Sequence, residues 1–70
     1  MQPADKLVMM ANQIAKNLAI QGEEKAVEMT AEHISKFWDP RMRAMIAKRM
    51  AEGGKGLEPI AARALERLST

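Results

Sequence analysis

Hydrophobic residues recur every three or four positions along most of this 70-residue chain, which is the spacing of amphipathic helices. Four stretches have this spacing: residues 3–20, 23–38, 40–52 and 59–68. The alternation of apolar and polar positions that is typical of strands does not occur. The pattern therefore predicts an all-α fold, a small bundle of three to four short helices that forms a single helical domain over residues 1–70.

Glycine and proline mark the boundaries of these helices. Gly22 and Gly53 each follow the last periodic residue of a stretch, and glycine there is typical of a helix C-terminus. The sharpest signal is Asp39-Pro40, because proline disfavours helix in the residue before it and fits the first position of a new helix. We therefore expect Asp39 to be the N-cap of the third helix, with its carboxylate accepting hydrogen bonds from the free amides of the first turn.

The apolar side of each predicted helix supplies the candidate core. Its residues are, helix by helix, Leu7, Met10, Ala11, Ile14 and Leu18; Ala26, Val27, Thr30, Ala31 and Ile34; Met42, Met45, Ile46 and Met50; and Ile60, Ala61, Ala64, Leu65 and Leu68. A core of this size gives a 70-residue chain little stability of its own, and the chain has no Cys for a disulfide. A partner chain is therefore the expected source of additional stability, and self-association is possible.

Composition excludes several classes of protein. A hydrophobic content of 47% argues against disorder, and a charged content of 29%, with no apolar run near ~18 residues, argues against a membrane span. No signal peptide is visible, and the absence of Cys is compatible with a reducing cytoplasmic setting. The 7 Met residues suit either irregular gaps in a core or a surface that adapts to a partner.

The formal charge of +2 is unevenly distributed along the chain. Residues 23–39 carry a net charge of −3, whereas residues 40–70 carry +4. The third predicted helix holds four of the basic residues: Arg41, Arg43, Lys48 and Arg49. This basic face is expected to be solvated or to dock on an acidic protein surface. A small nucleic-acid-binding helical module is a less favoured alternative, because the middle of the chain is acidic and aromatic residues for stacking are few.

The chain is poor in groups that catalysis needs. His33 is the only His, no Glu-x-x-His spacing exists, and no thiolate is available. The glycines of Gly-Gly-Lys-Gly, residues 53–56, follow a predicted helix and lack the strand and spacing of a phosphate-binding loop. We therefore predict no catalytic residues, no metal site and no cofactor.

The only two aromatic residues besides His33 adjoin at the predicted corner between the second and third helices. Phe37 and Trp38 can both pack inside, or one can fill the core while the other faces outward. An outward aromatic near Arg41 and Arg43 would suit a partner, because Trp and Arg are enriched in binding hot spots. The residues predicted to bind a partner are His33, Phe37, Trp38, Asp39, Arg41, Met42 and Arg43.

Three segments have a more distinctive sequence. The most specific is HISKFWDPRMR, residues 33–43; the others are KLVMMANQIAKNL, residues 6–18, and GGKGLEPIAARAL, residues 53–65. Together and in this order they resemble the small delta subunit of soluble, cytoplasmic NAD-dependent formate dehydrogenases that contain molybdenum. The resemblance covers most of the chain.

This resemblance implies a non-catalytic accessory subunit without a cofactor of its own. In that family formate oxidation belongs to a large alpha subunit with a bis-molybdopterin-guanine-dinucleotide molybdenum centre and iron–sulfur clusters, and electrons pass to flavin and NAD on other subunits. The expected partner is therefore the large alpha subunit, whose assembly, cofactor insertion or stability the chain would support. A transient assembly chaperone that leaves the mature enzyme is the alternative within the same resemblance.

Overall fold

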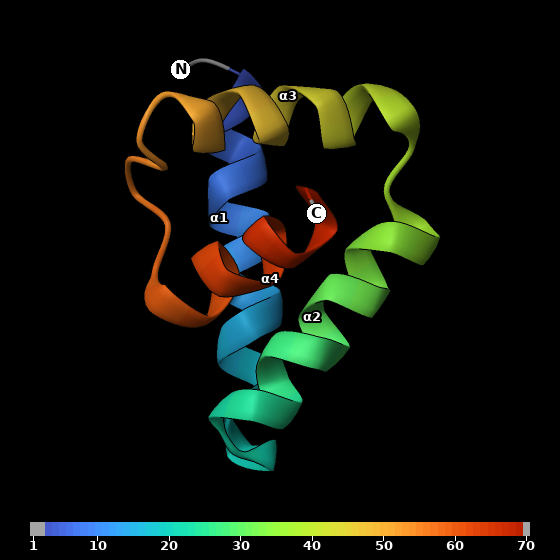
Figure 1. Cartoon of the computed structure of the whole chain (residues 1–70), viewed down its shortest axis with the longest axis vertical. Helices are drawn as coiled ribbons and strands as arrows, with labels where there is room; N and C mark the ends of the chain where they lie inside the picture. Colours follow the sequence, from blue (N-terminus) through green and yellow to red (C-terminus); the bar gives the residue numbers. More distant parts are fainter. Residues whose placement is uncertain (1–2, 70) are drawn as a thin grey trace.

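The computed structural model describes residues 3–69, which form four α-helices and a short 3-10 helix with no strand among them (Figure 1). The elements are α1 (Pro3–Leu18), η1 (Ala19–Gln21), α2 (Glu23–Phe37), α3 (Pro40–Ala51) and α4 (Pro59–Ser69). The predicted all-α fold is confirmed. Each predicted helix begins at the residue where the structure begins it, and each ends within two residues of the observed end.

The four helices surround one core. In Figure 1, α1 and α2 meet at η1, at one end of the long axis, and α3 crosses the opposite end beside the start of α1. Helix α4 packs between them, and its most extensive contact is with α2. The radius of gyration is 10.8 Å, close to the value of about 11 Å expected for a globular chain of this length.

Every helix contributes to the main core cluster. Ile34 of α2 and Ile46 of α3 are its largest fully buried aliphatic residues, and α1 and α4 supply the others. The predicted core face of α2 is confirmed in full. In α1 the buried residues are Leu7, Val8, Ala11 and Ala15.

The predicted core differs from the observed one in two details. In α1 the structure also buries Val8 and Ala15, while Met10 and Ile14 are partly buried and pack against the core, as do Met42, Met45 and Met50 of α3. A Cβ on Gly56 of the loop after α3 would lie 3.3 Å from Val8 Cγ1. At the end of α4, Leu68 is exposed although its spacing placed it in the core.

Helix α3 ends in a Schellman motif. The amide of Gly54 donates to the carbonyl of Arg49 at 2.8 Å, and the amide of Gly53 donates to the carbonyl of Met50 at 3.1 Å. Both glycines have positive φ, 107° at Gly53 and 65° at Gly54, a conformation that other residues rarely adopt. The prediction that these glycines terminate a helix is confirmed, and the chain turns back here toward α1.

The loop between α3 and α4 is held by side chains from distant parts of the chain. Asn12 of α1 donates from Nδ2 to the carbonyl of Gly56 and accepts at Oδ1 from the amide of Glu58, each at 2.9 Å. Arg49 donates to the carbonyl of Lys55 at 3.1 Å. These bonds fix the point at which α4 begins and therefore its position across the core.

Candidate functional site at the corner between α2 and α3

The corner, residues 33–43, is a tight turn between two helices. After Phe37 the backbone becomes extended at Trp38 and Asp39, with ψ of 135° and 167°. Asp39 Oδ1 accepts a hydrogen bond from the amide of Met42 at 2.8 Å, and Pro40 occupies the first turn of α3. The predicted N-cap is therefore confirmed: the carboxylate satisfies a free amide at the positive end of the helix dipole.

The turn separates the two aromatic side chains. Trp38 is only 5% exposed and belongs to the main core cluster, whereas Phe37 is 72% exposed. Phe37 lies against His33, one helical turn earlier, with ring centroids 4.8 Å apart. Trp38 is therefore not an exposed anchor, and the interpretation in which both aromatics pack inside is wrong for Phe37. One aromatic side chain fills the core and the other faces outward.

The basic residues of the corner have no partner within the described chain. Arg41 and Arg43 are exposed and form no ion pair among residues 3–69. Met42, between them, is half-buried against the core. The structure therefore brings Phe37 and His33 together on α2, places both arginines at the start of α3, and uses Trp38, Asp39 and Met42 to hold the turn.

Arg49 differs from the other basic residues of α3. It donates to Asp5 Oδ1 at 2.6 Å as well as to the loop carbonyl, and its side chain is only 15% exposed. Arg49 therefore does not belong to a free basic face. The sequence did not predict this role of Arg49, nor the role of Asn12 in the loop. Arg49 is 44 positions from Asp5, and Asn12 is 44 or more positions from Gly56 and Glu58, so no local pattern marks these pairs.

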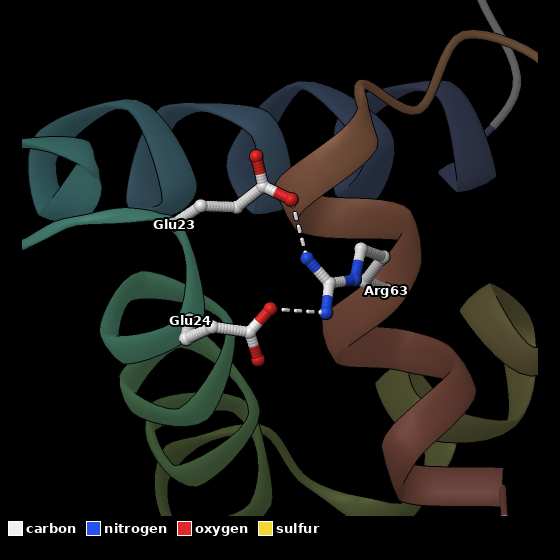
Figure 2. Close-up of polar contacts among 3 residues, drawn as sticks. All are labelled: Glu23, Glu24 and Arg63. Carbon is white, nitrogen blue, oxygen red and sulfur yellow. Dashed lines mark hydrogen bonds and ion pairs between the residues drawn. The ribbon is translucent and has the colours of Figure 1, made fainter.

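A second cluster of charges joins α4 to the start of α2. Figure 2 shows Arg63 between Glu23 and Glu24, with one guanidinium nitrogen directed to each carboxylate. The distance from Arg63 Nη2 to Glu24 Oε1 is 2.7 Å. This hydrogen bond, and then the charge of Arg63, lower the pKa of Glu24 below its ordinary value, and the same pairing raises the pKa of Arg63. The cluster fixes the end of α2 opposite the corner.

The described residues offer little for chemistry at the corner itself. Among them no group of three His, Cys, Asp or Glu residues is placed to hold a metal ion. His33 is exposed, and its ring contact is with Phe37. The arrangement can present an aromatic side chain and two guanidinium groups to another surface, which is a pattern of protein recognition.

None of the helices described is long and apolar enough to cross a membrane.

The fold and the corner together define a small four-helix protein that presents an aromatic and basic surface at a helix junction. Residues 6–65 match the family described as NADH-dependent formate dehydrogenase delta subunit FdsD. The chain therefore belongs to this family, as its sequence indicated, and is the small delta subunit of an oxidoreductase complex. No curated protein and no solved structure matches the chain.

Proposed function

We propose that the chain is a non-catalytic accessory subunit that binds the large alpha subunit of the formate dehydrogenase through the corner and supports its assembly, cofactor insertion or stability. One observation carries this proposal: Phe37 is a large apolar side chain held in solvent at a well-defined turn. An exposed aromatic of this kind is typical of the anchor residue of an interface.

The turn is suited to binding because it is already ordered. Trp38 is fixed in the core, and Asp39 caps the next helix, so the backbone that carries Phe37 has little freedom to lose. Ordering of interface groups is one of the main costs of association, and a rigid turn lowers it. The ring of His33 lies against that of Phe37 and adds to the surface that the corner would offer.

The seven residues predicted from the sequence divide into two roles in this proposal. Those that would touch the alpha subunit are His33, Phe37, Arg41 and Arg43, and those that hold their positions are Trp38, Asp39 and Met42. The two arginines would pair with carboxylates of the partner, because no carboxylate of residues 3–69 pairs with them.

The proposal also places the redox chemistry elsewhere in the complex. The molybdenum centre and iron–sulfur clusters would belong to the alpha subunit, and flavin and NAD to other subunits, while this chain would carry no cofactor. It would act in the cytoplasm together with the enzyme that it serves.

The test is co-purification from cells that express all subunits, with an affinity tag on this chain. We expect Phe37→Ala, and the double variant Arg41→Ala with Arg43→Ala, to retain less alpha subunit than the unchanged chain. Ile20→Ala is the matched control, because Ile20 is 89% exposed and lies in η1, far from the corner (Figure 1). Circular dichroism of each variant checks that it is folded.

The outcome separates the possible roles. Equal amounts of the alpha subunit with Phe37→Ala, the double variant and the control would overturn the site assignment. If the unchanged chain elutes with the active enzyme at constant ratio on gel filtration, it is a stable subunit. If it is found only with alpha subunit that lacks molybdenum, it is a transient assembly chaperone.

A further inference from the structure

A groove lies where α2, α3 and α4 meet. Its walls come from α3 and α4, through Pro40, Ala44 and Ala47 on one side and Leu65 and Leu68 on the other. Its volume is about 450 Å³, within the ~300–1,000 Å³ range of natural binding clefts. The exposure of Leu68, which the helical spacing had assigned to the core, results from its position at the edge of this groove.

The groove has one charge, and that charge is positive. Arg43 is its only ionisable lining residue, with Ser35 as the other polar one. Four other hollows on the described surface each include at least one carboxylate, among them Asp5, Glu23 and Glu24. Among these five hollows of the described surface, this groove combines apolar walls with a cation and has no carboxylate in its lining.

Arg43 lies one turn into α3, four residues after Asp39, whose carboxylate occupies the positive end of the helix dipole. Arg43 itself forms no ion pair in residues 3–69. Its guanidinium is therefore available to a carboxylate supplied by another molecule.

We propose that the groove binds an acidic segment of the alpha subunit, with an apolar side chain between α3 and α4 and an adjacent carboxylate on Arg43. This inference rests on the proposed function and adds the chemistry of the partner. Charge argues against a second copy of the chain, because two-fold pairing through the groove would bring one Arg43 toward the other.

The groove and Phe37 can be tested separately because Phe37 does not line the groove. Arg43 lines the groove and also belongs to the corner, so its substitution affects both contacts. Phe37→Ala and Ala47→Phe each change one contact without the other.

The first experiment fills the groove. Ala47→Phe places a large side chain in it from an exposed position on α3, and Ala51→Phe adds the same side chain to α3 outside the groove. We expect Ala47→Phe to weaken binding to the purified alpha subunit by roughly tenfold or more and Ala51→Phe to leave it unchanged. Equal affinity of the two variants would overturn the inference.

The second experiment tests the acidic character of the partner segment. We expect Arg43→Glu to weaken binding by roughly tenfold or more and to reduce its dependence on salt, while Lys48→Glu, an exposed charge change on α3 outside the groove, has a much smaller effect. Similar losses for both reversals would show only a general attraction of charge and would overturn the specific pairing with Arg43.

The remaining outcomes distinguish this inference from the proposed function. If Phe37→Ala loses the alpha subunit while Ala47→Phe retains it, the corner binds and the groove inference is wrong. If the unchanged chain does not bind the alpha subunit, both are wrong. A dimer of the isolated chain that Ala47→Phe converts to a monomer would assign the groove to a second copy and overturn the inference.

Discussion

The two junctions at the ends of α3 are built in opposite ways. The corner before α3 is made by residues that adjoin in sequence. Trp38 packs in the core, and Asp39 caps α3 by accepting a hydrogen bond from the amide of Met42. The loop after α3 ends its helix with local glycines, but its path to α4 is fixed by Asn12, which comes from the first helix.

The difference explains which junction is free to serve a partner. The corner needs no help from distant polar side chains, so Phe37, Arg41 and Arg43 remain available at its surface. In the loop, three backbone polar groups are already bonded: the Gly56 carbonyl and the Glu58 amide to Asn12 of α1, and the Lys55 carbonyl to Arg49 of α3. A junction stabilised by its neighbours in sequence can present its other side chains outward.

The sharpest test of the corner compares its two adjacent aromatic residues. Trp38→Ala should lower the free energy of unfolding by about 3–5 kcal/mol, because it leaves a cavity in the core shared by all four helices. Phe37→Ala should change it by less than about 0.5 kcal/mol, because that side chain is mostly in water. Urea unfolding followed by circular dichroism measures both.

Each of the two variants serves as the control for the other, because both remove an aromatic side chain from the same turn. Equal destabilisation would mean that Phe37 also supports the fold, and its exposure would then not mark a binding residue. A small effect of Trp38→Ala would contradict the assignment of the corner to the core.

The loop is tested by removing its long-range support. Asn12→Ala should lower the free energy of unfolding by about 1–2 kcal/mol, because two backbone groups of the loop lose their partner. Gln13→Ala is the matched control, because Gln13 is exposed and its side chain bonds only to Asn17 on the same helix. Hydrogen exchange at the amide of Glu58 should become faster in the Asn12 variant alone. Unchanged exchange there would show that the glycine turn orders the loop by itself.

The same division decides what could be predicted from the sequence. Helix boundaries, the cap at Asp39 and the glycine stop at residue 53 depend on a few consecutive residues, and all were predictable. The roles of Asn12 and Arg49 depend on residues brought near by the fold, so Arg49 was assigned to a basic face and no role was predicted for Asn12. Membership of the delta-subunit family was also predictable, because the resemblance rested on local runs of sequence.

The exposure of Phe37 and the burial of Trp38 could be predicted only in part. The sequence left two arrangements open, one with both aromatics inside and one with a single aromatic facing outward. The structure decides between them, because Trp38 lies in the core and Phe37 lies in solvent. The groove beside Arg43 was not predictable, because it needs three helices in place.

The cap at Asp39 should contribute less to the free energy of unfolding than the core packing of Trp38. Asp39→Ala should lower the free energy of unfolding by about 1 kcal/mol, because the amide of Met42 loses its acceptor. Asp39→Asn should recover most of this loss, because the amide oxygen of Asn also caps helices well. Thermal unfolding of the three proteins at neutral pH measures the effect. Similar losses for Ala and Asn would show that the charge of Asp39, and not its hydrogen bond, stabilises α3.

The ion pairs around Arg63 should give the smallest effect. They link residues about 40 positions apart, as the hydrogen bonds of Asn12 do, but they join largely exposed charged side chains, and surface ion pairs add little stability. Since Arg63 lowers the pKa of Glu24 in the folded chain, the unfolded chain binds the proton more readily. This stabilisation is present above the ordinary range of a glutamate pKa and is lost as the pH falls through the lowered value.

Comparison of the unchanged chain with Glu24→Gln should therefore show the largest difference in unfolding free energy at neutral pH and none at a pH below the lowered pKa. The difference should also shrink in high salt, which screens exposed charges. Glu28→Gln is the control, because Glu28 is exposed on the same helix and forms no ion pair in residues 3–69. A difference that persists at low pH would mean that Glu24 acts through packing and not through its charge pairing with Arg63.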